Sequence, residues 1–239
     1  MKHHLVAPLI AVFLLNGPLA AAQDFSSIGS QYMDFGASMM AVGQMNNVLG
    51  SSVHGGAPPV SRPAASVDTR YRASSAVSTR VRGQFADFVA RTDPANGDRL
   101  RQAVQRNDML GAWEKHVSVD GLRRGDVADA MTAYWVQNWQ IANTAPFTDR
   151  AQVQAVRGQI HRTLSSSPAF ARLDDAGKQA LAEVFMLNFV AQGSAFSDAT
   201  TKGDRGLSHR LSDAAVARFR KEMGVDPRQL KLSRTGFAR

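Results

Sequence analysis

The 239-residue chain contains no cysteine, which excludes disulfide bonds, thiolate metal sites and a cysteine nucleophile. Glutamate and lysine are also scarce, with 3 glutamates against 17 aspartates and 6 lysines against 22 arginines. The net charge of +8 therefore depends on arginine, whose planar guanidinium suits bidentate contacts with anions. The longest apolar run covers residues 5–15 and is too short for the ~20 residues that cross a bilayer as a helix.

The first 22 residues have the pattern of an export signal. Lys2 supplies a positive charge before the apolar run, and small residues at Ala20 and Ala22 precede Gln23. We therefore expect residues 1–22 to be removed, leaving a periplasmic or secreted protein with no transmembrane segment. A membrane anchor is the alternative, and the short apolar run argues against it.

Residues 23–53 are nearly free of charge and rich in glycine and methionine. An apolar residue followed by glycine recurs every seven residues, at Ile28, Phe35, Val42 and Leu49. One further position lies between each successive pair, and Asn46 is one of these. The full set is spaced alternately by four and three residues, which is typical of a coiled-coil seam. Each interior glycine costs a helix about 1 kcal/mol relative to alanine, so a helix here needs a partner.

We expect the segment 23–53 to be either disordered or helical only on association, with a second copy, its own globular domain, a protein partner or a membrane surface. A copper(I) site formed by its methionines with His54 is a further interpretation. Residues 54–66 are rich in proline and glycine and predict a linker.

Residues 67–239 predict an all-α domain, either orthogonal or bundle-like, of about seven helices. Apolar residues recur at helical spacing throughout this range, and no long stretch alternates with period two. Most predicted starts are marked by residues that cap helices, namely Ser74 or Ser75, Asp93, Asn107 or Asp108, Asp126, Asp174 or Asp175, and Ser212. A further helix follows Thr148.

Two asparagines, Asn138 and Asn188, lie in the middle of apolar helical stripes. Because an unpaired buried amide costs about 1–3 kcal/mol, each must find a partner. They either bond to each other or to backbone at a helix crossing, or they line a pocket for a small apolar ligand or lipid. In the second case the ligand-binding residues are Tyr134, Trp135, Asn138, Trp139, Asn188 and Phe189.

The stretch Tyr134–Trp139 also aligns with Val184–Phe189 at an offset of fifty residues. Either a duplicated helical hairpin or the general similarity of apolar helices explains this alignment.

Groups suited to catalysis are few. The chain has no HExxH, GxSxG, P-loop or GxGxxG motif, and its histidines lack metal-ligand spacing. Paired aspartates near helix starts are explained by capping, and Glu114 beside Trp113 is the best isolated acid. We therefore expect no metal, no cofactor and a non-catalytic protein, with an envelope hydrolase as an alternative.

Basic charge is concentrated toward the two ends of the predicted domain. Residues 62–91 carry a net +4 and residues 215–239 a net +5, whereas residues 92–214 are balanced. If these ends pack together, they form a surface for an anionic envelope component; otherwise they are solvated helix faces. Export and the lack of a recognition motif argue against nucleic acid as a partner.

Residues 133–143, AYWVQNWQIAN, follow the export signal and the small-residue N-terminal region. In this combination the chain resembles uncharacterised secreted bacterial proteins grouped as a domain of unknown function. The resemblance implies export and a helical fold and assigns no substrate. The sequence thus favours an exported, non-catalytic helical binding protein of the bacterial envelope or exterior, with the N-terminal segment as association element. The alternatives are a carrier of a small apolar ligand or lipid near Trp135 and Asn138, and an envelope hydrolase.

Overall fold

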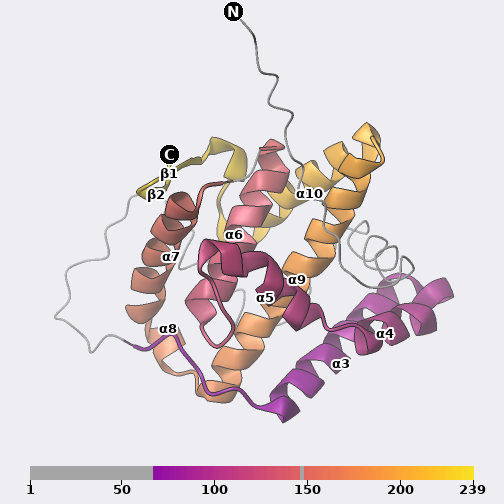
Figure 1. The fold of residues 1–239 in the computed structure, drawn as a ribbon, viewed down its shortest axis with the longest axis horizontal. Coiled ribbons are helices and arrows are strands. Elements are labelled where there is room, and N and C mark those ends of the chain that lie inside the picture. The colour runs from indigo at the N-terminus through magenta and orange to yellow at the C-terminus, as the bar shows by residue number, and fades with distance from the viewer. Residues whose placement is uncertain (1–66, 146–147) are drawn as a thin grey trace, which may run out of the picture.

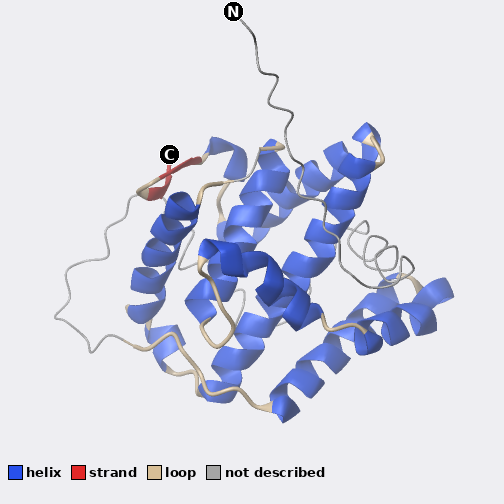
Figure 2. Cartoon of the chain, in the orientation of Figure 1, coloured by secondary structure: helices blue, strands red, loops and turns tan. Residues whose placement is uncertain are grey.

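The computed structural model describes residues 67–145 and 148–239. The predicted signal, association segment and linker lie outside these residues. The described part is a mostly helical domain with a small C-terminal hairpin (Figures 1 and 2), which confirms the predicted helical fold. Its eight α-helices are α3 (Ser75–Thr92), α4 (Gly97–Arg106), α5 (Met109–Val117), α6 (Val127–Asn143), α7 (Arg150–Ser165), α8 (Pro168–Ala171), α9 (Asp175–Thr201) and α10 (Arg205–Met223).

Aspartate side chains begin most of these helices. Each accepts a hydrogen bond from a backbone N–H of the first turn, which satisfies a donor that has no partner within the helix. The capping residues are Asp108 in α5, Asp126 in α6, Asp149 in α7, Asp174 in α9 and Asp204 in α10. A short carboxylate reaches these N–H groups, which gives five of the aspartates a role that suits aspartate better than glutamate.

The helix predicted after Thr148 is α7, which Asp149 caps in a capping box with Gln152. One predicted helix start was wrong. The last helix begins at Arg205 instead of after Ser212, which lies within α10 and donates its hydroxyl to the Ala142 carbonyl at 2.8 Å. Ser212 therefore attaches α10 to α6 instead of capping a helix.

Helix α9 runs through the centre of the domain (Figure 1). Its neighbours are α6, α3, α5 and α10, so all of its faces are covered, and every residue from 178 to 195 is buried. Apolar side chains occur on all faces of this helix, as burial on all sides requires, and the polar side chains among them, such as Gln179, Glu183 and Gln192, are hydrogen-bonded. Among the described helices, none is long and apolar enough to cross a membrane.

The C-terminal hairpin consists of β1 (Lys231–Ser233) and β2 (Gly236–Ala238), which pair antiparallel with Leu232 opposite Phe237. It was not expected from the sequence. The hairpin lies on α7, where Gln159 Oε1 accepts from the Phe237 N–H at 3.0 Å. The Phe237 ring contacts both Trp135 and Trp139, with each pair of ring centroids 6.2 Å apart.

Candidate functional site

Asn138 of α6 lies at the centre of a buried polar network that joins three helices. Its Nδ2 donates to the Tyr134 carbonyl at 2.9 Å and to Gln192 Oε1 of α9 at 3.1 Å. Its Oδ1 accepts from Arg218 Nη2 of α10 at 2.5 Å, and the same nitrogen donates to Gln192 Oε1 at 3.3 Å. Asn138, Gln192 and Arg218 are 0%, 4% and 8% exposed. Both donors of the amide are used, so its role here is to connect helices.

The interior position of Asn138 was predicted from the sequence, whereas Arg218 was expected on a basic C-terminal surface. The spacing of α10 contained a signal, because Arg218 follows Ala215 by three residues and precedes Phe219 on a buried stripe. A hydrogen bond to a charged group contributes roughly 1.5–3 kcal/mol. The guanidinium thus supplies the partner that the buried amide oxygen needs.

The aromatic residues predicted to line a pocket form part of the core. Tyr134 contacts Phe185 and Phe219 at ring-centroid distances of 5.1 Å and 6.0 Å, and Trp135 contacts Phe219 edge-on at 5.0 Å. Trp139 is partly buried and donates its Nε1 to the Leu230 carbonyl at 2.9 Å. Tyr134, Trp135, Asn138 and Trp139 are therefore brought together on α6, against α10 and the hairpin.

The other two predicted residues, Asn188 and Phe189, are also buried, at 2% and 4% exposure on α9. The Phe189 ring lies 5.4 Å from the ring of His116 on α5. Burial lowers the pKa of His116. Trp135 Nε1 is buried and has no hydrogen-bond partner among the described residues.

The aspartates near the start of α6 form an ion-pair cluster with α7. Arg157 Nη2 lies 3.0 Å from Asp126 Oδ2, and Arg157 Nε donates to Asp129. Asp129 also accepts the Arg123 N–H at 3.0 Å, while Asp126 caps α6. Burial raises the pKa of Asp129, and the Arg157 hydrogen bond opposes this rise. The capping explanation therefore holds for Asp126, whereas Asp129 connects α6 to α7 through Arg157.

A second buried carboxylate, Glu183 of α9, was not singled out from the sequence. Its Oε1 accepts from the Ser78 hydroxyl of α3 at 2.5 Å and from Gln179 Nε2 at 2.8 Å, and Glu183 is 2% exposed. Gln179 also exchanges hydrogen bonds with the backbone of Ser74, at 2.8 and 2.9 Å. These contacts fasten the first turn of α3 to α9.

Glu114, the predicted isolated acid, is half-buried on α5, and its Oε1 accepts the Arg124 N–H at 3.4 Å. Among the contacts of Glu114 in the described residues, no second carboxylate is placed as glycoside cleavage requires. Within residues 67–145 and 148–239, no group of three or more His, Asp or Glu side chains is arranged to hold a metal ion.

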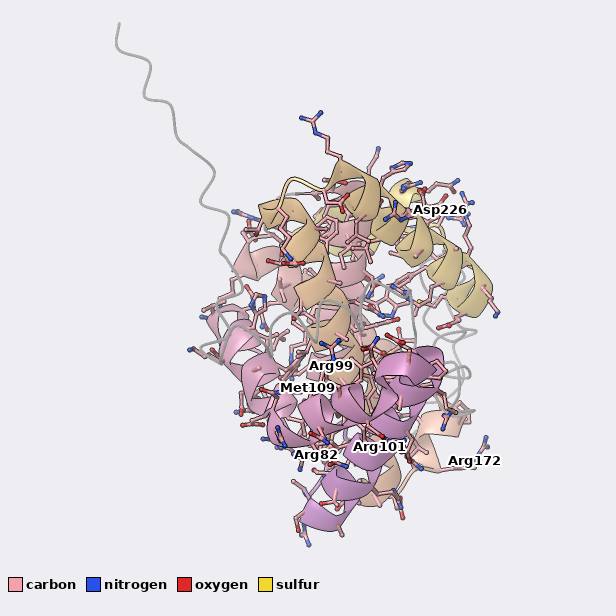
Figure 3. All side chains as sticks on the ribbon, turned by 90° about the vertical axis from the view of Figure 1, so that its right-hand side faces the viewer. Arg82, Arg99, Arg101, Met109, Arg172 and Asp226 are labelled. Carbon is pink, nitrogen blue, oxygen red and sulfur yellow. The ribbon has the colours of Figure 1, made fainter. Side chains whose placement is uncertain are left out.

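The two basic ends do not form one surface. α3 and α4 lie at one end of the domain and the C-terminal hairpin at another (Figure 1); Figure 3 likewise shows Arg82 and Arg101 far from Asp226. Many C-terminal arginines are also paired with acids. These pairs are Arg220 with Asp226 at 2.5 Å, Arg228 with Asp213 at 2.7 Å and Arg234 with Asp149 at 3.4 Å.

Comparison with known proteins places the chain in a family. A family model described as "Family of unknown function (DUF6683)" matches residues 1–238. No curated protein and no solved structure matches the chain. The family is consistent with the resemblance carried by residues 133–143. The chain belongs to this family of unknown function, DUF6683.

Proposed function

We propose that this protein is an exported, non-catalytic binding protein, in which the helical domain is a scaffold and the segment 23–53 is the association element. One observation carries the proposal. The polar side chains best suited to chemistry, Asn138, Asp129 and Glu183, are each buried and bonded between helices.

A general acid, a general base or a ligand-orienting amide needs a free donor or acceptor that faces its substrate. Asn138 donates both of its amide hydrogens to protein oxygens, and Asp129 accepts from Arg157 and from backbone. These groups are thus suited to holding the helices in place. The support for an envelope hydrolase reduces to Glu114, which accepts a backbone N–H.

The support for an association element comes from the sequence of residues 23–53, which lie outside the described residues. Four glycines in the repeat cost a helix about 4 kcal/mol relative to alanine. Packing of the apolar seam against an identical seam is a source of compensating contacts, and Asn46 supplies a polar position that fixes register in such pairs. A second copy of the chain is therefore the partner that we propose to test first.

The test is the mass in solution of residues 23–239, measured by light scattering over a range of concentrations. Val42→Asp with Leu49→Asp places two charges in the seam. Ala41→Asp with Val48→Asp is the matched control, because it places the same charges one residue earlier and outside the seam. We expect the wild type and the control to associate and the seam variant to be monomeric. A monomeric wild type, or equal masses for both variants, would contradict the proposal.

A carrier of a small apolar ligand is the second candidate, because Trp135 Nε1 is buried without a hydrogen-bond partner in the described part of the chain. A ligand acceptor at this nitrogen would remove the free-energy cost of its burial. Native mass spectrometry of the purified protein tests this candidate. A co-purified ligand that is lost in Trp135→Phe would favour the carrier over the scaffold.

A further inference from the structure

The connection between α5 and α6, residues 118–125, is firmly held through its backbone. The N–H groups of residues 123–125 donate in turn to the side chains of Asp129, Glu114 and Tyr71, at 3.0, 3.4 and 3.3 Å. These three partners come from α6, from α5 and from the segment before α3. The backbone of the loop is thus held by three separate parts of the chain, so the Cα positions that carry its side chains are also held in place.

The side chains that this loop presents to solvent are basic and unpaired. Arg123 and Arg124 are exposed, and neither guanidinium has an ion pair with another described residue. Arg150 at the start of α7 lies against the loop, since its Nη2 would be 2.7 Å from a Cβ built on Gly121. Lys115 is exposed in the last turn of α5.

Acidic groups near the loop only partly offset this charge. Asp120 lies beside Arg150, and burial raises the pKa of Asp120 while the Arg150 charge opposes the rise. Glu114 is half-buried and accepts the Arg124 N–H. Asp126 and Asp129, which also lie beside the loop, are both paired with Arg157 of α7. With these included, five basic groups lie against four acidic ones, and the unpaired charge of the surface is positive.

The same loop carries an exposed apolar side chain. Val119 is 72% exposed and stands out among the described residues as the large hydrophobic side chain left in solvent. It lies in the 3-10 turn Ser118–Asp120, after which Gly121 takes a φ of +78°. Arg123 follows Val119 by four positions in the chain, so their Cα atoms are at most about 14 Å apart.

We propose that this surface, the Val119 loop with Arg123, Arg124 and Arg150, docks on a membrane surface rich in anionic phospholipid. Arginine guanidinium groups bind phosphate oxygens in a bidentate manner, and an exposed apolar tip enters the headgroup region. Charge alone would fit an acidic polysaccharide equally well, but a polysaccharide has no use for Val119. Because the loop is already held in place, docking loses little conformational entropy. This inference does not depend on the proposed self-association.

The test is flotation of residues 23–239 with vesicles of equal parts phosphatidylglycerol and phosphatidylcholine, and with vesicles of phosphatidylcholine alone. We expect binding to the anionic vesicles that weakens as salt is raised. Each basic residue near such a surface contributes roughly a five-fold change in partitioning. Arg123→Ala with Arg124→Ala should therefore weaken binding about 25-fold. Val119→Asp should also weaken it, and Val119→Leu should strengthen it.

The matched control is Arg91→Ala with Arg106→Ala, which removes the same charge from exposed positions in the last turns of α3 and α4, outside the loop. It should leave binding within about two-fold of wild type. The proposal is overturned if anionic vesicles do not bind the protein, if the control variant loses as much binding as the loop variant, or if Val119→Asp binds as wild type does. Equal binding to a soluble acidic polysaccharide, insensitive to Val119, would also overturn it. Urea unfolding of each variant confirms that these surface changes leave the fold intact.

Discussion

Tyr71 and Gly125 hold each other by two hydrogen bonds. The Tyr71 N–H donates to the Gly125 carbonyl at 3.0 Å, and the Gly125 N–H donates to the Tyr71 hydroxyl oxygen at 3.3 Å. Gly125 adopts a φ of +91°, a conformation that suits glycine and strains other residues. This contact attaches the segment before α3 to the loop before α6 and completes the support of the Val119 loop.

The hydroxyl of Tyr71 should ionise late. Burial raises its pKa to about 12; the Gly125 N–H opposes this rise, and the charge of Glu183 adds to it. Between pH 10 and 12 the folded chain keeps a proton that the unfolded chain loses. Stability should therefore be complete below pH 10 and fall as pH rises through this window, by up to about 3 kcal/mol. The measurement is the tyrosinate absorbance as a function of pH.

Tyr71→Phe identifies the signal, because the transition near pH 12 should lose the amplitude of one tyrosine in this variant. The variant also loses the hydrogen bond from Gly125 and should be less stable by about 1 kcal/mol at neutral pH. A Tyr71 midpoint near the ordinary value of 10 would show that the hydroxyl is not held as described.

His116 should make the protein less stable in mild acid. Its pKa is lowered by burial, so below pH 6.5 the unfolded chain takes up a proton that the folded chain resists. The contribution is present above pH 6.5 and is lost as pH falls. Urea unfolding should show that the free energy of unfolding changes less between pH 7 and pH 5 in His116→Gln than in the wild type. The control is His209→Gln, whose side chain is 76% exposed; an equal effect of the two variants would count against the prediction.

Ser78→Ala should weaken the attachment of α3 to α9. The Ser78 hydroxyl donates to Glu183 Oε1 at 2.5 Å, and a hydrogen bond to a carboxylate in the interior contributes roughly 1.5–3 kcal/mol. We expect a loss of this size in the free energy of unfolding in urea. Thr79→Ala, at an exposed position next along the same helix, should change stability by less than about 0.5 kcal/mol. Equal stability of the two variants would remove the role assigned to this contact.

Much of the fold follows from local sequence, since aspartates mark helix starts and the apolar content of α9 predicts its burial. The start of α10 was missed because residues 203–210 carry one large apolar side chain, Leu207, and so little periodicity. The hairpin was missed because strands of three residues are too short to show alternation.

The polar network shows the same limit. The burial of Asn138 could be predicted from its own helix, whereas its partners Gln192 and Arg218 lie 54 and 80 residues away. Which distant side chains meet depends on how the helices pack, and spacing within one helix does not contain that information. An arginine in a basic segment was therefore assigned to the surface by composition, although it lies on a buried stripe.

A double-mutant cycle on Asn138 and Arg218 tests the central claim, that the polar interior serves to hold the helices together. Asn138→Ala leaves a buried guanidinium short of a partner and should destabilise the domain by about 2–4 kcal/mol. Arg218→Met removes the charge and should be destabilising by a smaller amount. In urea unfolding, the two changes should show a coupling energy of about 1.5–3 kcal/mol. Single variants as stable as the wild type, together with a coupling energy near zero, would contradict the claim.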